Sequence, residues 1–348
     1  MDTKKECIGS YPDTLCNTSD CLVPVQSLPT YDTTIVDDCQ SAPLQIGDKW
    51  HTKKEKSLHL CDIYRRLGYQ SKADRVLSCG NFLDFKAFVH DDGTVSDIKL
   101  HRANFCKDNL CPMCAWRRSL KIFGQTSAIM DVIGSDHRFV FATFTVPNVS
   151  GSVLKLTIDR MMLAFKRLSQ RALVKKHTDG FFRALEITYN SKTNTFHPHF
   201  HVVFAVDPSY AQQSSIHYIK QSDWLKMWQE CFEDDTIQFV NVKMCRPDID
   251  GTYNKSVCEI SKYAVKPSDY NDYVVSIFTD SLYNRRLFHY GGIFKKVASD
   301  LKLDDIQDGD LTHVEAISNP TLANIVLKHK WQIGVGYVLY DIVPYLPI

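Results

Sequence analysis

The chain has 348 residues, of which 44% are hydrophobic and 23% charged, so it can bury a full core and is long enough for one large or two ordinary domains. No stretch has the length of a membrane span, and residues 1–13 lack the apolar run of a signal peptide, which argues against membrane and secreted classes. We therefore expect a cytoplasmic protein with no membrane partner. Its twelve cysteines are then expected to be thiols or metal ligands.

Residues 1–50 differ in charge from the rest of the chain. They contain eight acidic and three basic residues, are rich in Ser, Thr and Pro, and show no sustained hydrophobic period. This pattern is typical of a flexible leader. Because the whole chain has a net charge of only +1, the part after residue 50 is correspondingly basic. We expect any phosphate-binding surface to lie there.

Residues 51–135 are predicted to form a helical and zinc-knuckle module. Apolar residues between Lys53 and Ser78 have a helical spacing that breaks near Gly68, which indicates two short helices. A hairpin over 82–105, turning at Asp91-Asp92-Gly93, follows them.

Four cysteines flank this hairpin, and the last two form a Cys-Pro-Met-Cys pair. Thiolates hold zinc tetrahedrally, so the set predicts a structural zinc site, with reduced buried thiols as the alternative. The expected ligands are Cys79, Cys106, Cys111 and Cys114. Directly afterwards come Arg117, Arg118 and Lys121, which we expect to contact the DNA backbone, although an amphipathic docking helix would have the same pattern.

Residues 136–300 alternate between predicted strands and helices. The order is βαββαβ followed by a helix, which predicts an α+β fold of the ferredoxin-like, split βαβ type: an antiparallel sheet with helices on one face. In that topology the third strand is central, between the first and the second. The predicted strands are 139–146, 181–189, 195–206 and 237–244, and the predicted helices are 153–174, 215–232 and 255–265.

The third predicted strand contains three alternating histidines, His197, His199 and His201. Alternate residues of a strand share a face, so the three imidazoles project from one side of the sheet. If the preceding hairpin is symmetric, with Asn190 opposite Thr195, then Glu186 lies opposite His199.

Two imidazoles and a carboxylate suit a divalent ion that keeps open positions, and the carboxylate favours Mn or Mg. We therefore predict one ion held by Glu186, His199 and His201, with His197 either a further ligand or a supporting neighbour. The alternative is that these are polar strand residues without a metal.

A second group of chemical residues lies on the last predicted helix. Glu259, Lys262, Tyr263 and Lys266 have the spacing of one helical stripe, and Pro267 ends the helix. A solvated helix face with the tyrosine packed on the core would look the same. The position of this helix in the chain, soon after the histidine strand, favours a reactive role for its tyrosine.

These motifs resemble the rolling-circle replication initiators (Rep proteins) of small Gram-positive plasmids, within the His-hydrophobic-His endonuclease superfamily. The likeness covers roughly residues 65–294. The matching stretches are Cys79-Gly80, Phe105-Cys106-Lys107, Leu110-Cys111-Pro112-Met113-Cys114, Trp116-Arg117-Arg118-Ser119-Leu120-Lys121, residues 141–148, Arg183-Ala184-Leu185-Glu186, His197-Pro198-His199-Phe200-His201 and residues 259–266.

The resemblance implies roles for individual residues. His199 and His201 would hold the catalytic metal, Tyr263 would be the nucleophile, and Glu259 matches a glutamate found four residues earlier in one subgroup. We expect Lys262 to contact DNA and Lys266 to belong to the catalytic group.

The implied activity is origin nicking and strand joining. Tyr263 would attack the scissile phosphate to give a 5′-phosphotyrosine and a 3′-OH primer, and Glu259 would activate water at termination. A conjugative relaxase, a single-Tyr transposase and a non-catalytic zinc-dependent DNA-binding regulator are the alternatives.

The expected partners are the plasmid double-strand origin and its single-stranded nick site, with a host helicase and polymerase; dimerisation is left open. The domain reading is a leader over 1–50, the zinc module over 51–135, the nicking domain over 136–300 and a C-terminal extension over 301–348.

Overall fold

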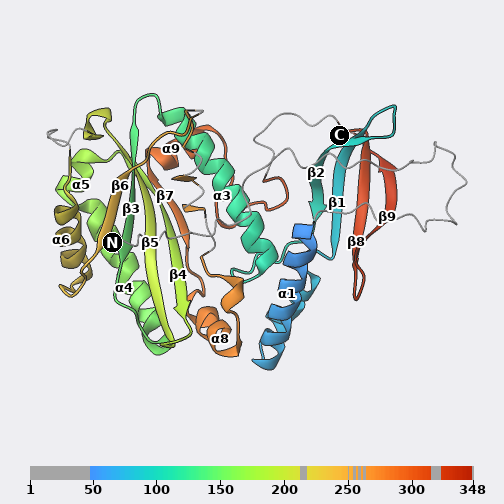
Figure 1. The fold of residues 1–348 in the computed structure, drawn as a ribbon, viewed down its shortest axis with the longest axis horizontal. Coiled ribbons are helices and arrows are strands. Elements are labelled where there is room, and N and C mark those ends of the chain that lie inside the picture. Colours follow the sequence, from blue (N-terminus) through green and yellow to red (C-terminus); the bar gives the residue numbers. More distant parts are fainter. Residues whose placement is uncertain are drawn as a thin grey trace, which may run out of the picture.

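The computed structural model describes residues 48–211, 218–249, 251–253, 256–257, 260–261, 264–314 and 323–346. These residues form two lobes, each built around an antiparallel sheet (Figure 1). The predicted α+β class is therefore confirmed. Residues 1–47 of the expected leader lie outside the described part of the chain, as do Glu259, Lys262 and Tyr263.

The first lobe combines both ends of the described chain. Its four-stranded sheet has the order β2-β1-β8-β9, with all pairs antiparallel. The segment expected as a C-terminal extension thus supplies two strands of this sheet. The elements are α1 (Asp48–Arg66), α2 (Gln70–Ser78), β1 (Phe82–Val89), β2 (Val95–Ala103), β8 (Ile325–Gln332) and β9 (Gly336–Pro344).

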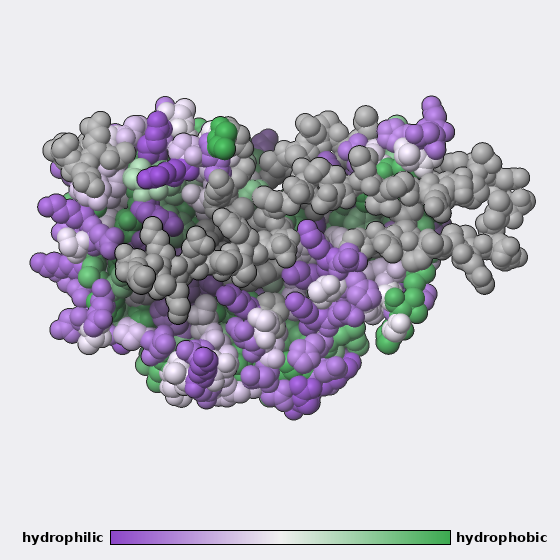
Figure 2. Space-filling view, in the orientation of Figure 1, coloured by the Kyte–Doolittle hydropathy of each residue, from purple (hydrophilic) through white to green (hydrophobic). Residues whose placement is uncertain are grey.

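The first turn of helix α1 packs against one face of this sheet. The ring of Trp50 meets Phe85 of β1 edge to face, with centroids 5.6 Å apart, and His51 lies 5.0 Å from the ring of Trp331. The expected break between the two helices is confirmed at Gly68, whose φ of +78° is a left-handed conformation that glycine adopts without strain. In the same view, the surface of the molecule around α1 and α8, along its lower edge, is mostly hydrophilic (Figure 2).

The second lobe has a five-stranded sheet of order β6-β3-β5-β4-β7. Its first four strands have the predicted order, with the histidine strand β5 between β3 and β4. Strand β7, which pairs with β4, was not predicted. The elements are β3 (Arg138–Thr145), α4 (Gly151–Gln170), α5 (Ala172–His177), β4 (Gly180–Asn190), β5 (Thr195–Val206), the 3-10 helix η1 (Pro208–Ala211), α6 (Gln221–Phe232), β6 (Val240–Met244), the 3-10 helix η2 (Pro267–Asp269), α8 (Asp272–Ser281), β7 (Phe288–Gly292) and α9 (Ile293–Asp300).

Helices cover both faces of this sheet, so the prediction of helices on one face is wrong. On one side, Phe144 of β3 contacts Phe165 of α4 and Trp228 of α6. On the other side, Phe139 of β3 contacts Phe294 of α9, with centroids 6.3 Å apart. The histidines share the second face, because Phe141, two residues from Phe139, lies 5.4 Å from the His201 ring. Helix α9 covers only the end of this face at Phe139.

Helix α3 (Pro112–Ile133) joins the two lobes. Residues 304–312, named here the acidic strap, lie along it, and the basic side chains of the helix bind the strap. Arg117 donates to the carbonyls of Leu311 and Thr312 at 2.9 and 2.8 Å, and Lys121 donates to the Asp304 carboxylate at 2.6 Å.

Arg118 completes this set by donating to the carbonyls of Gln307 and Lys107, each at 3.2 Å. The side chains of Arg117, Arg118 and Lys121 are between 0 and 3% exposed. The expectation that these three residues contact DNA is therefore wrong: their donors hold the strap against α3 and have no open surface.

Candidate active site

The β4–β5 hairpin has the predicted register. Asn190 pairs with Thr195, and Glu186 pairs with His199. The side chain of Asn190 accepts a hydrogen bond from the main-chain nitrogen of Lys192 at 3.0 Å, which closes the turn locally. This local chemistry fixes the register that places the carboxylate and the imidazoles on one face.

Glu186, His199 and His201 converge. The Oε2 atom of Glu186 lies 2.9 Å from Nε2 of His201 and 3.5 Å from Nε2 of His199. All three residues are buried, between 8 and 9% exposed, and the three atoms that could bind a metal lie within 4.8 Å of one another. The group can hold a metal ion, since two neutral imidazoles and a carboxylate are a common set of donors for divalent ions.

The second ring nitrogens support this reading. Nδ1 of His199 donates to the carbonyl of His197 at 3.1 Å, which leaves Nε2 directed at Glu186. Nδ1 of His201 lies 3.3 Å from Oγ1 of Thr143 on β3. The sequence reasoning missed Thr143, although the strand register places it opposite His201.

The carboxylate of Glu186 is held in its charged form. Burial alone would raise its pKa, but hydrogen bonds from His199 and His201 keep that pKa well below the ordinary value for glutamate. Glu186 therefore provides a buried, negatively charged oxygen beside two imidazoles. A carboxylate that stays ionised is the form that binds a cation.

His197 stands beside this group but is not part of it. Its ring stacks on His199 with centroids 5.2 Å apart, and its side chain is half-buried. Burial, followed by the nearby His199, lowers its pKa. Of the two predicted roles for His197, the geometry favours the supporting neighbour over the further ligand.

The predicted catalytic helix is described at only a few positions. Ala264, which follows Tyr263 in the chain, accepts a hydrogen bond at 2.8 Å from the main-chain nitrogen of Ile187. Ile187 follows Glu186 in β4, so the chain next to Tyr263 is bonded beside the metal-binding group. Ser261 is buried, and Lys266 is exposed.

The four predicted zinc ligands also come together. The sulfur of Cys79 lies 3.5 Å from that of Cys114 and 3.7 Å from that of Cys111, and Cys106 lies 3.6 Å from Cys114. A zinc–sulfur distance of about 2.3 Å places the sulfurs of a tetrahedral site about 3.8 Å apart. The spacing fits such a site and is far too long for a disulfide, which would need about 2.05 Å.

Main-chain donors contact two of the four sulfurs. The main-chain nitrogens of Lys107 and Cys106 point at Cys114 and Cys79, at 3.2 and 3.4 Å. Lys54 of α1 is fully buried and donates to the carbonyl of Cys79 at 2.7 Å. The spacing of the four sulfurs allows the group to hold a metal ion, and a closed set of four thiolates leaves no open coordination position for catalysis.

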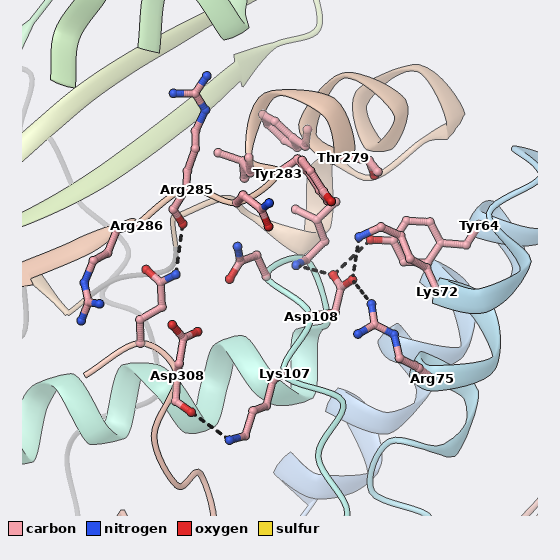
Figure 3. A pocket seen from close by; sticks show the side chains of 16 residues that line it. Tyr64, Lys72, Arg75, Lys107, Asp108, Thr279, Tyr283, Arg285, Arg286 and Asp308 are labelled. Atoms are coloured by element: carbon pink, nitrogen blue, oxygen red, sulfur yellow. Dashed lines mark hydrogen bonds and ion pairs between the residues drawn. The ribbon is translucent and has the colours of Figure 1, made fainter. Parts of the chain in front are cut away.

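A polar cleft of about 580 Å³ lies between the lobes (Figure 3). At its floor, Asp108 accepts hydrogen bonds from Tyr64 and Lys72, each at 3.1 Å, and has Arg75 at 3.8 Å. Lys107 donates to the carbonyl of Asp308 in the strap at 2.8 Å. Lys72 and Arg75 are therefore paired with Asp108, and Lys107 binds the strap.

Residues 97–337 match the family model described as Replication protein. The chain belongs to this replication protein family. The resemblance to the Rep initiators of rolling-circle plasmids is thereby confirmed. Within this replication protein, no described helix is both long enough and apolar enough to cross a bilayer.

Curated members of the replication protein family cover most of the chain. A Protein rep of Streptococcus pneumoniae serotype 2 (strain D39 / NCTC 7466) is 36% identical over 301 residues, which is 81% of this chain and 92% of the relative. A Protein rep of Bacillus amyloliquefaciens is 37% identical over 324 residues, 83% of this chain and 93% of the relative. No solved structure gives a significant match.

Proposed function

We propose that this replication protein nicks and rejoins plasmid DNA at a replication origin, with the His-hydrophobic-His endonuclease fold in its second lobe. The observation that carries the proposal is the convergence of Glu186, His199 and His201 beside the strand position to which Ala264, the neighbour of Tyr263, is bonded. A nucleophile next to a metal-binding group is the arrangement that phosphodiester transfer requires.

Glu186, His199 and His201 would hold a divalent ion, Mn or Mg, which when bound polarises the scissile phosphate. The hydroxyl of Tyr263 attacks that phosphorus, so the Tyr263 O–P bond forms and the bond to the 3′ oxygen breaks. The proton from Tyr263 leaves to solvent or a base, and the departing 3′ oxygen takes up a proton to become a primer hydroxyl. Lys266 is exposed and is proposed to offset the phosphate charge.

Rejoining reverses this exchange, since the phosphotyrosine conserves the bond energy. At termination, Glu259 would act as general base for water, releasing the 5′ phosphate without a second tyrosine. The zinc group of the first lobe has a structural role in this proposal. The partners would be origin DNA, its single-stranded nick site and the host helicase and polymerase, in the cytoplasm.

The test is cleavage of a single-stranded origin oligonucleotide labelled at its 3′ end, with Mn or Mg. The wild-type protein should yield a labelled, detergent-stable protein–DNA adduct. Tyr263→Phe keeps the ring and removes the hydroxyl, so the adduct should disappear, whereas Tyr283→Phe, at an exposed tyrosine of the same chain, should leave it unchanged. An adduct that persists in Tyr263→Phe would move the nucleophile elsewhere.

Glu259→Ala separates the two steps. The first cleavage should persist in this variant while hydrolytic release falls sharply. Absence of both nicking and adduct in the wild-type protein would favour a non-catalytic DNA-binding regulator. Activity on a transfer origin or a transposon end, and not on a replication origin, would favour a relaxase or transposase.

A further inference from the structure

Lys54 of α1 is a cation in the interior of the first lobe. In Figure 1, α1 lies between α3 and the sheet of this lobe, and Lys54 is 0% exposed. Its side chain donates to the main-chain carbonyls of Leu77 and Cys79 at 2.8 and 2.7 Å and to Oδ1 of Asn81 at 2.8 Å. An ammonium has three N–H donors and a neutral amine only two, so three acceptors at these distances indicate the charged form.

These three oxygens satisfy the hydrogen bonds of Lys54 but do not balance its charge. Within the part of the chain that the structure describes, no aspartate or glutamate is ion-paired with it. The carbonyls of Leu77 and Cys79 lie at the C-terminal end of α2, whose dipole supplies only about half of a negative charge. Because a buried charge without an opposite charge is costly, a further negative group is expected beside Lys54.

The four-cysteine group is next to this ammonium. In Cys79, four covalent bonds join the carbonyl oxygen that Lys54 binds to the sulfur, which keeps the ammonium within about 8 Å of that sulfur. The sulfurs of Cys114 and Cys111 follow at 3.5 and 3.7 Å from it. The same side of α1 approaches the group again at Ser57, three residues later, where Oγ lies 3.5 Å from the sulfur of Cys111.

The buried charge separates the two interpretations of the cysteines. Four protonated thiols are neutral and would leave Lys54 without an opposite charge. Four thiolates around a divalent ion have a net charge of about −2. Burial lowers the pKa of Lys54, and the sulfurs of Cys79, Cys111 and Cys106, in that order, oppose this effect. The ammonium therefore favours metal-bound thiolates over reduced thiols.

We propose that Lys54 provides the positive charge that balances the four-thiolate metal centre and thereby increases its affinity for the ion. This inference rests on the structural zinc of the proposed function. The ammonium binds oxygens and not a sulfur, so Lys54 is a positioning residue: it holds the main chain of the ligand Cys79 and stabilises the ionised sulfurs through its charge. Supporting partners of metal ligands typically contribute about 10- to 100-fold to metal affinity.

The first test measures the zinc affinity of the full chain by competition with a chelator of known affinity. Lys54→Met removes the charge and the donors, whereas Lys54→Gln removes the charge and keeps two N–H donors. Both should raise the Kd for zinc about 10- to 100-fold. Lys56→Met, at an exposed lysine of the same helix, is the matched control and should keep the wild-type Kd.

Two results of this test would overturn the proposal. Wild-type affinity in Lys54→Gln, with a loss only in Lys54→Met, would mean that the hydrogen bonds matter and the charge does not. A wild-type chain that binds no zinc would remove the metal centre and this inference with it. Neither result depends on DNA, so the nicking reaction is judged separately by its own assay.

Replacing zinc by cobalt(II) adds a measurement that a loss of packing does not change. The visible bands of cobalt report its tetrahedral geometry, and an ultraviolet band arises when an electron moves from a thiolate to the metal. A positive charge beside the sulfurs lowers the energy of their electrons. Lys54→Gln should therefore move the ultraviolet band to longer wavelength and keep the visible bands, even if Lys54→Met does not fold. An ultraviolet band at the wild-type wavelength would show that Lys54 only packs, and would overturn the proposal.

Discussion

Oε2 of Glu186 lies 2.9 Å from Nε2 of His201, and both side chains are buried. A carboxylate and an imidazole at this distance can share a proton or a cation. Because hydrogen bonds from His199 and His201 keep the pKa of Glu186 below its usual range, the carboxylate remains ionised near neutral pH and can bind either.

Glu186→Gln tests this relationship, because it keeps the shape and removes the charge. We expect Mn affinity to fall by at least tenfold, since an amide is a poorer ligand than a carboxylate for such an ion. Isothermal titration with MnCl₂ measures the change. Glu230→Gln, an ion-paired glutamate on α6, is the control and should bind Mn like the wild type. Equal affinity in both variants would place the ion elsewhere.

Cys111→Ser should remove the structural zinc. Metal affinity of four-thiolate sites amounts to about 10 kcal/mol or more at neutral pH and is coupled to folding, so the first lobe should lose its cooperative unfolding transition. Elemental analysis should find one zinc per wild-type chain and much less in the variant. Cys231→Ser, at a buried thiol outside the cluster, should retain the zinc. Wild-type protein free of zinc would contradict the assignment.

Arg117→Met should destabilise the protein through the acidic strap. The change leaves the carbonyls of Leu311 and Thr312 without their donor, and each buried polar group left unbonded costs about 1–3 kcal/mol. We expect a loss of roughly 2–4 kcal/mol in the free energy of unfolding, measured by urea titration. Arg65→Met removes an exposed arginine of α1 and should cost far less. Similar losses in the two variants would mean that the strap contacts contribute little.

Asp310 makes the strap sensitive to acid. Burial opposes its ionisation, but the main-chain N–H groups of Thr312 and His313 and the His313 imidazole lower its pKa to about 2. A carboxyl whose folded pKa lies below its unfolded value of about 3.9 stabilises the fold above that value. This contribution is lost as the pH falls from about 4 to about 2.

Asp310→Asn should therefore flatten the decline of stability between about pH 4 and pH 2. The group is half exposed, so the effect should be modest. Chemical unfolding at several pH values measures it, with Asp136→Asn as the exposed control. An identical pH profile in wild type and Asp310→Asn would show that this carboxyl does not control the acid response.

Features that depend on residues close together in the chain were predicted correctly from the sequence. The register that sets Glu186 against His199 follows from a short hairpin whose turn is closed by Asn190, and strand alternation then fixes the shared face. The convergence of the four cysteines was predicted in the same way, because a C-x-x-C pair and a hairpin bring four thiols together.

Distant pairings and burial were not predictable in this way. Nothing in residues 325–332 identifies β1, more than 200 residues earlier, as its partner, and the glycines of β7, Gly291 and Gly292, weaken its strand pattern. A run such as Arg117-Arg118 reads as a solvated or DNA-binding face, because charge gives no sign of burial when the acceptors are main-chain carbonyls far along the chain. Thr143 escaped notice because a lone threonine in a strand has no signal of its own.

The pairing of β1 with β8 has a consequence for how the protein is made. During synthesis, β1 and β2 leave the ribosome as an isolated hairpin, which is marginally stable alone, and wait for residues 325–344 before their sheet can close. The second lobe needs no strand from beyond Gly292 and can fold earlier. A ribosome that stops before residue 325 would therefore release a chain with a nearly complete second lobe and an open first lobe, prone to aggregation through the unpaired edge of β1.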